Sequence, residues 1–180
     1  MDERKRTVQA GYDSLASEFL VWTAKIEDDP RHRLLDDFVS RLPAEARVLD
    51  LGCGAGVPST TSLAERFEVV GVDISKAQIE LARQNVPRAT FIHGDVFGRI
   101  ALWLKPGGWF LASLSPRDSV DWSGDWLGVE MFFSGFDAET NRRLLRDAGF
   151  GLVFDDVISM SEPEGPAAFL WVIAQKASGA

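Results

Sequence analysis

The sequence predicts an α/β fold in which a mostly parallel β-sheet is flanked by helices. Three short apolar runs of strand length, at residues 48–51, 68–72 and 89–93, alternate with segments of helical periodicity. Strands and helices alternating at this spacing indicate βαβ units, whose strands are parallel. The first run ends in a cluster of glycines, and such turns lie at the edge where open parallel sheets bind ligands.

Two helices precede the first strand. Residues 6–24 carry apolar side chains at helical spacing, and Pro30 opens a second helix that Pro43 closes. No interdomain linker is visible. We therefore expect a single domain over residues 1–180, with residues 1–45 as an N-terminal helical cap.

The later elements follow from caps, breakers and apolar runs. Ser75 is a suitable N-cap for a helix at 76–85, and Asp137 for a helix that ends at Gly149. The tryptophan-rich residues 115–136 are predicted to form a loop. The remaining predictions are helices at 59–67 and 97–104, a strand at 109–114, and two antiparallel final strands at 151–160 and 167–175.

Composition excludes several classes of protein. Of 180 residues, 46% are hydrophobic and 26% charged, which is ordinary for a globular domain, and the net charge of −8 argues against a nucleic-acid partner. No segment approaches the ~20 continuous apolar residues of a membrane span, and no signal peptide is visible. Cys53 is the only cysteine, so we expect a cytoplasmic protein without disulfides. No spacing of metal ligands stands out.

The strongest chemical signal is Asp50-Leu51-Gly52-Cys53-Gly54-Ala55-Gly56, at the junction of a strand and a helix. Glycines there let a ligand approach the backbone closely, and Asp50 suits a cationic group such as an amine. Two nucleotide motifs are excluded, because Val57 stands where a dinucleotide fingerprint needs glycine and the phosphate-loop G-K-[ST] is absent. A purely structural turn remains an alternative.

Two further aspartates favour a ligand site. Asp73 ends the second strand, about 20 residues after the glycines, where a carboxylate can accept both hydroxyls of a ribose. Asp95 follows the third strand at the same edge of the sheet. An aspartate at the end of each of three successive strands indicates a site for an adenosine that carries a cationic group rather than a pyrophosphate.

In these motifs the chain resembles the class I, Rossmann-like, S-adenosylmethionine-dependent methyltransferases of the small-molecule type. The resemblance covers the glycine loop at 48–56, the acidic strand end at 69–73, the adenine motif at 93–96 and the turn at 104–108. Residues 11–16 are similar to the N-terminal helix segment that closes over the cofactor in that family.

The resemblance implies S-adenosylmethionine as cofactor and a small-molecule methyl acceptor. Gly52, Cys53 and Gly54 would hold the methionine part, with Asp50 near its amino group. Asp73 would bind the ribose, and Tyr12 would reach the methionine carboxylate. The adenine would contact Ile74, Asp95 and Val96.

One part of the family's core is missing. Between the adenine motif and the turn at 105–108 the family has a fourth strand and a further helix, whereas this chain has only residues 97–104. A strand with its crossover helix needs ~30 residues. We expect the strand at 48–51 to pair directly with that at 109–114; otherwise an apolar sheet edge stays exposed.

Because this part of the core is missing, three functions remain possible for the chain. Methyl transfer to a small molecule is the first, a non-catalytic cofactor binder that has lost its acceptor site is the second, and a protein that pairs through an exposed sheet edge is the third. An aromatic cluster within the predicted loop is read either as a hydrophobic lid or as a wall for the acceptor; it comprises Trp122, Trp126, Met131, Phe132 and Phe133. No catalytic base is identified.

Overall fold

The structure is a computed structural model that describes residues 2–95 and 103–178. The chain divides into two compact units. The first comprises Met1–Lys25, Pro43–Phe97 and Ser123–Phe132, and the second comprises Ile26–Leu42, Gly98–Trp122 and Phe133–Ala180. The single domain expected from the sequence stays a prediction.

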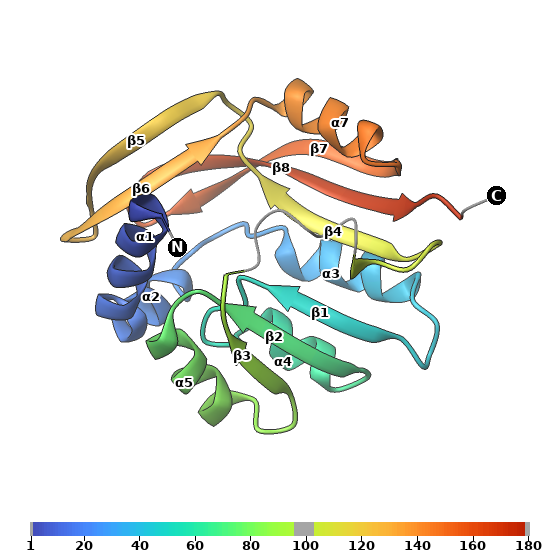
Figure 1. The fold of residues 1–180 in the computed structure, drawn as a ribbon, viewed down its shortest axis with the longest axis horizontal. Coiled ribbons are helices and arrows are strands. Elements are labelled where there is room, and N and C mark those ends of the chain that lie inside the picture. Colours follow the sequence, from blue (N-terminus) through green and yellow to red (C-terminus); the bar gives the residue numbers. More distant parts are fainter. Residues whose placement is uncertain (1, 96–102, 179–180) are drawn as a thin grey trace. The chain divides into compact units, whose positions relative to one another are not determined.

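The first unit contains the parallel sheet predicted from the apolar runs. Its strands β1 (Arg47–Leu51), β2 (Glu68–Asp73) and β3 (Thr90–His93) lie side by side in that order (Figure 1). Leu51 pairs with Val72 and Asp73 with His93, so the three carboxyl ends meet at one edge. This arrangement confirms the parallel pairing expected for the three apolar runs.

Two helices pack against this sheet. The helix α4 (Ser59–Ala64) packs against β1 and β2, and α5 (Lys76–Asn85) packs against β2 and β3. Ser75 caps α5 as predicted, because its Oγ accepts a hydrogen bond of 3.1 Å from the backbone N–H of Gln78. The capped start of α5 therefore lies directly beyond the end of β2.

The N-terminal segment differs from its prediction. In place of one helix at 6–24 there are α1 (Glu3–Ser14) and α2 (Ala16–Thr23), separated at Leu15, which has φ −98° and ψ 4°. Ser14 donates its hydroxyl to the carbonyl of Ala10 at 2.9 Å, a bond that competes with the backbone ladder and bends helices. Hydrophobic spacing alone does not detect such a break.

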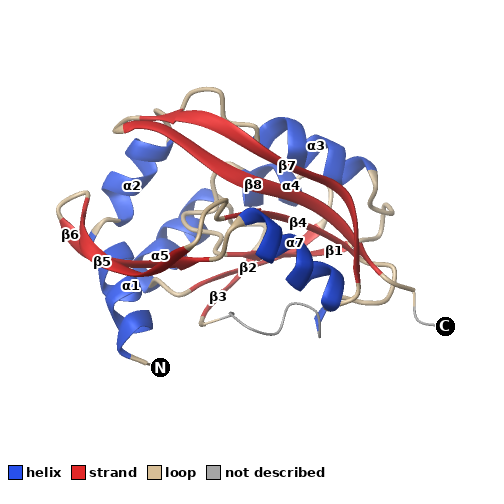
Figure 2. Ribbon diagram, turned by 90° about the horizontal axis from the view of Figure 1, so that it is seen from above, coloured by secondary structure: helices blue, strands red, loops and turns tan. Residues whose placement is uncertain are grey.

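The second unit contains an antiparallel sheet in the order β4-β8-β7. Its strands are β4 (Trp109–Leu114), β7 (Phe150–Glu162) and β8 (Gly165–Lys176), and Figure 2 shows β7 and β8 running side by side along their length. A buried cluster of Phe150, Leu170, Val172 and Ala174 lies on this sheet. The antiparallel final strands are thus confirmed, and both are longer than predicted.

The described residues of the second unit include the helices α3 (Arg31–Ser40) and α7 (Ala138–Asp147). Asp137 caps α7, accepting from the backbone N–H of Thr140 at 2.7 Å, and Gly149 follows the helix with φ +87°. Both features match the prediction. No helix within the described residues is long and apolar enough to cross a membrane.

The predicted direct pairing of the strands at 48–51 and 109–114 concerns strands of different units, and it stays a prediction. Within the second unit, β4 pairs antiparallel with β8, from Trp109↔Gln175 to Leu114↔Leu170. The predicted short helix at 97–104 falls largely outside the described residues.

The predicted loop at 115–136 is wrong. It contains a two-stranded sheet of β5 (Ser119–Trp126) and β6 (Val129–Gly135). Leu127 and Gly128 join the strands with φ values of +55° and +83°, the left-handed conformation of a tight hairpin turn. In β5, Gly124 interrupts the alternation of apolar residues that is typical of a strand, so the sequence pattern did not reveal this strand.

Candidate functional site

The glycine loop after β1 is tied to the end of β2. The backbone N–H groups of Gly52 and Cys53 both donate to the carbonyl of Val72, at 2.8 and 3.2 Å. Gly52 and Gly54 have φ values of +71° and +52°, which residues with a Cβ rarely adopt. The sequence therefore places glycines where the turn requires them.

The same glycines leave open space in front of the loop. Among the described residues, a Cβ built on Gly52 meets no atom within 4 Å, and one built on Gly54 meets only Oε1 of Gln78, at 3.8 Å. Side chains at these positions would project into that space. The missing Cβ atoms thus leave room for a ligand against the backbone.

Asp73 lies at the centre of the site. Its carboxylate accepts from the backbone N–H groups of Gly54 at 2.9 Å and Ser75 at 2.8 Å, and the side chain is 8% exposed. Burial raises the pKa of Asp73; the two N–H donors counteract this effect, while the nearby charge of Asp13 adds to it. Because an ionised carboxylate has about four acceptor positions, Asp73 keeps capacity for further donors.

The helix α1 is anchored to the start of α5 beside this carboxylate. Oδ1 of Asp13 accepts from the hydroxyl of Ser75 at 2.6 Å and from the backbone N–H of Ala77 at 3.0 Å. Asp13 therefore satisfies a free N–H at the N-terminus of α5. This contact fixes the side of α1 that carries Tyr12.

Tyr12 belongs to an aromatic group. Its ring makes edge contacts with Phe19 and Trp126, at centroid distances of 5.3 and 6.1 Å. Trp22 stacks on Phe19 and meets Trp126 edge-on at 5.6 Å. Burial and the charge of Asp73 raise the pKa of Tyr12 to about 12, so its hydroxyl stays protonated at neutral pH.

A pocket of about 240 Å³ lies within the first unit at this edge of the sheet. Five of the residues singled out from the sequence line it: Tyr12, Gly52, Gly54, Asp73 and Ile74. The structure thus brings the N-terminal helix, the glycine loop and the end of β2 to one cavity. Their individual roles toward a ligand stay predictions.

Four lining residues were missed by the sequence reasoning: Val8, Phe19, Gln78 and Gly94. Val8 lies one helical turn before Tyr12 on the same apolar face, and Gly94 directly precedes Asp95. Gln78 had a detectable signal, because it is a polar residue on the face of α5 that also buries Ile79 and Ala82.

Asp50, Cys53 and Asp95 are not among the residues that line the pocket. Asp50 accepts a 2.6 Å hydrogen bond from the hydroxyl of Thr60. Cys53 is buried, and its burial, together with the charges of Asp50 and Asp73, raises the pKa of its thiol well above the usual range. Val96 lies outside the described residues. The predicted contacts of these residues with a cofactor remain predictions.

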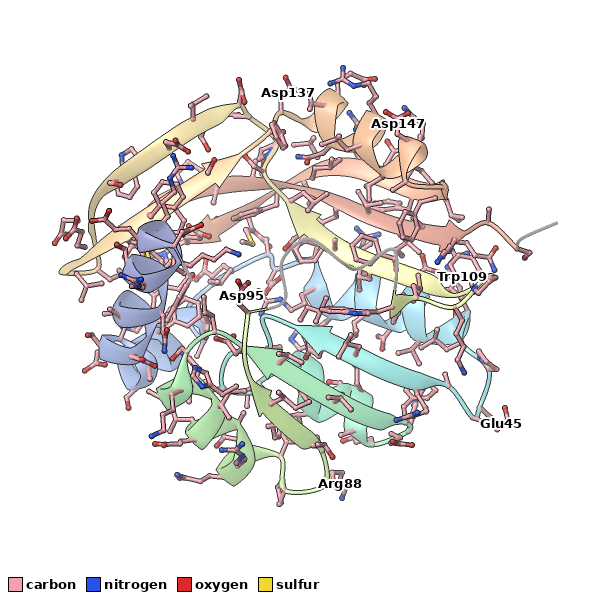
Figure 3. The ribbon with its side chains drawn as sticks, viewed as in Figure 1. Glu45, Arg88, Asp95, Trp109, Asp137 and Asp147 are labelled. Carbon is pink, nitrogen blue, oxygen red and sulfur yellow. The ribbon has the colours of Figure 1, made fainter. Side chains whose placement is uncertain are left out.

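Asp95 lies just beyond the carboxyl end of β3, at the other end of that strand from Arg88 (Figure 3). Its Oδ2 is 2.6 Å from Nζ of Lys5 on α1. The hydrogen bond to Asp95 is the main cause of the raised pKa of Lys5. The ion pair gives α1 a second attachment at the edge that carries the pocket.

The members of the predicted aromatic cluster lie in different surroundings along the β5–β6 hairpin. Trp126 joins the Tyr12 group, and Met131 is fully buried. Trp122 and Phe133 stack on each other at 5.6 Å, with 43% and 38% of their surfaces exposed. The guanidinium carbon of Arg4 lies over the ring of Phe132, 5.4 Å from the ring centroid. Within the described residues, Trp126 thus stands in the group that adjoins the pocket.

A parallel sheet with a glycine loop and a buried aspartate at its carboxyl edge defines a Rossmann-like, nucleoside-binding type of fold. Residues 48–102 match the family model described as a methyltransferase domain. The sequence of this segment is similar to that of a methyltransferase domain, and the chain shares its fold with solved structures of methyltransferases.

Among curated relatives, the chain is similar to trans-aconitate 2-methyltransferase of Paracidovorax citrulli strain AAC00-1. The two are 37% identical over 102 residues, which cover 54% of this chain and 37% of that relative. The chain therefore spans well under half the length of the relative it matches. Because the similarity extends over only part of each protein, the activity of this chain is a matter for a proposal.

Solved structures show the same fold at low identity. The 1,6-didemethyltoxoflavin-N1-methyltransferase of Burkholderia thailandensis, solved with 1,6-didemethyltoxoflavin and S-adenosylhomocysteine, matches with a TM-score of 0.65 and 21% identity, covering 94% of this chain and 87% of that one. A [4+2]-cyclase matches with a TM-score of 0.69 and 17% identity, covering 97% of both chains. The predicted Rossmann-like fold is confirmed.

Proposed function

We propose that this protein binds S-adenosylmethionine in the pocket of its first unit and transfers the methyl group to a small organic acceptor. The observation that carries the proposal is the meeting of Gly52, Gly54 and Asp73 around one cavity. The open space where Cβ atoms would stand on the two glycines suits a ligand that packs against the backbone. The methyltransferase-domain match at residues 48–102 supports the same cofactor.

The lining residues have chemistry that fits the parts of this cofactor. Asp73 is held in place by two backbone N–H groups and keeps acceptor capacity, which suits the hydroxyls of a ribose. Ile74 offers apolar surface for an adenine, and the protonated hydroxyl of Tyr12 can donate to a carboxylate. The glycine loop approaches the methionine part through its backbone alone.

S-adenosylmethionine supplies a methyl group on a sulfonium, which is already an excellent leaving group. The main task of the protein is then to hold the donor and exclude alternative geometries. Asp73 and the glycine loop perform this task through contacts that are in place before the ligand arrives. We assign no residue as a base.

For the acceptor we propose a small molecule, and a small carboxylic acid is the first class to test. The relatives named trans-aconitate 2-methyltransferases favour such an acid. We place the protein in the cytoplasm as part of the proposal, since Cys53 is its only cysteine.

A non-catalytic binder of S-adenosylmethionine or S-adenosylhomocysteine is the second candidate. Only residues 96–104 separate Asp95 from the turn at 105–108, where the family has a strand and a helix that contribute to the acceptor site. The structural similarity to a [4+2]-cyclase is a reminder that the fold supports other chemistry.

Calorimetry with S-adenosylmethionine and S-adenosylhomocysteine tests the shared part of both candidates. We expect dissociation constants of about 1–100 μM for the wild-type protein, equivalent to about −5.5 to −8.2 kcal/mol, and no measurable binding by Asp73→Ala. Asp36→Ala, an exposed aspartate of α3, is the control and should bind normally. A folded wild-type protein that binds neither ligand would refute the proposal.

Methyl transfer then separates the two candidates. The wild-type protein is incubated with S-adenosylmethionine carrying a labelled methyl group and a panel of acceptors that includes trans-aconitate and related di- and tricarboxylic acids. Label in a product, absent with Asp73→Ala, supports the enzyme. Tight cofactor binding without transfer to any acceptor favours the non-catalytic binder.

A further inference from the structure

Gln78 has an unusual environment on α5. The residue is 1% exposed, and its backbone N–H donates to the capping hydroxyl of Ser75. Its side-chain Oε1 and Nε2 are both buried, yet neither makes a hydrogen bond within the described part of the chain. A complete amide group is thus withdrawn from water without a protein partner.

Such an arrangement is costly and rare in folded proteins. Nearly all buried polar side-chain atoms have a partner, and those that lack one usually have a functional reason. An apolar residue of the same length would fill the position on the buried face of α5 without this penalty. A requirement other than packing therefore explains a glutamine here.

The place of the amide indicates what that requirement is. Gln78 lines the pocket, and its Oε1 is 3.8 Å from the Cβ position of Gly54. The N–H of Gly54 donates to Oδ2 of Asp73, which lines the same pocket. The amide of Gln78 and the carboxylate of Asp73 therefore both lie next to Gly54.

We propose that Gln78 is a cofactor-binding residue that shares the recognition of the ribose hydroxyls with Asp73. This inference rests on the proposed function, since it assigns a contact to the same cofactor. A ribose presents two neighbouring hydroxyls, each of which donates and accepts. A carboxylate only accepts, whereas an amide both donates and accepts, so the pair satisfies both hydroxyls better than Asp73 alone.

The proposal has a consequence for stability as well as for binding. In the ligand-free protein the unpartnered amide destabilises the fold, and the ligand removes that penalty. Replacing Gln78 by an apolar residue of similar length should therefore stabilise the ligand-free protein and lower its affinity for the ligand. A glutamine with a purely structural role would show neither effect.

The test uses Gln78→Met, with Gln84→Met on the exposed face of the same helix as the matched control. Binding of S-adenosylhomocysteine and 5′-methylthioadenosine is measured by calorimetry. The latter keeps the ribose and lacks the amino-acid part. We expect the affinity of Gln78→Met for both ligands to fall about tenfold. Its Tm without ligand should rise by about 2–4 °C. Gln84→Met should change neither quantity.

A second comparison removes a hydroxyl from the ligand, and its first measurement uses the wild-type protein alone. We expect removal of one ribose hydroxyl, in 2′-deoxy or 3′-deoxy 5′-methylthioadenosine, to cost the wild-type protein about tenfold in affinity. Gln78→Met should lose less than this on the same removal, because the partner of that hydroxyl is already gone.

The outcomes separate this inference from the proposed function. A wild-type protein that binds neither S-adenosylhomocysteine nor 5′-methylthioadenosine refutes the proposed function, and the role of Gln78 falls with it. Normal wild-type binding together with equal binding by Gln78→Met overturns the inference alone. A loss confined to S-adenosylhomocysteine, or equal affinity of the wild-type protein for the deoxy ligands, also overturns the assignment to the ribose.

Discussion

The contact of Asp13 with the start of α5 holds the helix that carries Tyr12, so its removal should loosen one wall of the pocket. Asp13→Ala deletes two hydrogen bonds, from the Ser75 hydroxyl at 2.6 Å and the Ala77 N–H at 3.0 Å. Hydrogen bonds to charged groups contribute about 1.5–3 kcal/mol each. Asp13 is half-buried, and its charge also repels that of Asp73, so we expect a net loss of about 2 kcal/mol for the pair.

Urea denaturation measures this loss, and hydrogen exchange locates it. The midpoint should fall, and the amides of α1 (Glu3–Ser14) should exchange faster in Asp13→Ala than in the wild-type protein. Asp13→Asn keeps Oδ1 as an acceptor and should lose about half as much. Asp36→Ala controls for the loss of a carboxylate at an exposed site. A free energy of unfolding within 0.5 kcal/mol (about the effect of an ordinary surface substitution) of wild type for Asp13→Ala would refute the reasoning.

Three further predictions concern the pocket and its support. Because the pKa of Asp73 is raised above 3.8, its carboxylate takes up a proton at a higher pH than an ordinary aspartate. Calorimetric affinity for S-adenosylhomocysteine should therefore fall as the pH drops through that raised pKa and stay level above it, and this dependence should be absent from Asp73→Asn. Gly71→Ala would place a Cβ 2.7 Å from the ring of Phe91 and should cost about 1–3 kcal/mol in urea denaturation. Gly151→Ala meets nothing closer than 3.8 Å and serves as its control. Tyr12→Phe should lower the affinity for S-adenosylhomocysteine about threefold to tenfold and leave the affinity for 5′-methylthioadenosine unchanged. Equal losses of affinity for both ligands would contradict a contact of Tyr12 with the amino-acid part.

The sequence predicted those elements whose ends carry a chemical signal. The helix α5 (Lys76–Asn85) was predicted with its observed ends, because Ser75 caps it and Pro87 follows it. The strand β4 (Trp109–Leu114) was predicted equally well from the turn before it. Local signals of this kind are independent of the rest of the fold.

Errors arose where a local pattern is interrupted. In the hairpin, Gly124 interrupts the alternation of side chains that would have revealed β5. The single helix predicted at 6–24 is likewise broken at Leu15 into α1 and α2. Local propensity does not resolve such interruptions.

The candidate site was predicted through its motifs and missed where no motif exists. Gly52, Gly54 and Asp73 were found because their residue types are required by the turn and by the proposed ligand. Gln78 was overlooked because a glutamine in a helix attracts no attention by itself. A search for polar residues on the buried face of each predicted helix would have identified it.

The edge-on contact of Trp22 and Trp126 gives the protein an optical signal of its own. Two indole rings with centroids 5.6 Å apart and planes inclined by 73° couple their electronic transitions, which produces a pair of circular-dichroism bands of opposite sign. Trp126 also touches Tyr12, whose other surroundings include the pocket. Arrival of a ligand beside Tyr12 should therefore change these bands, and binding can be followed spectroscopically without a label.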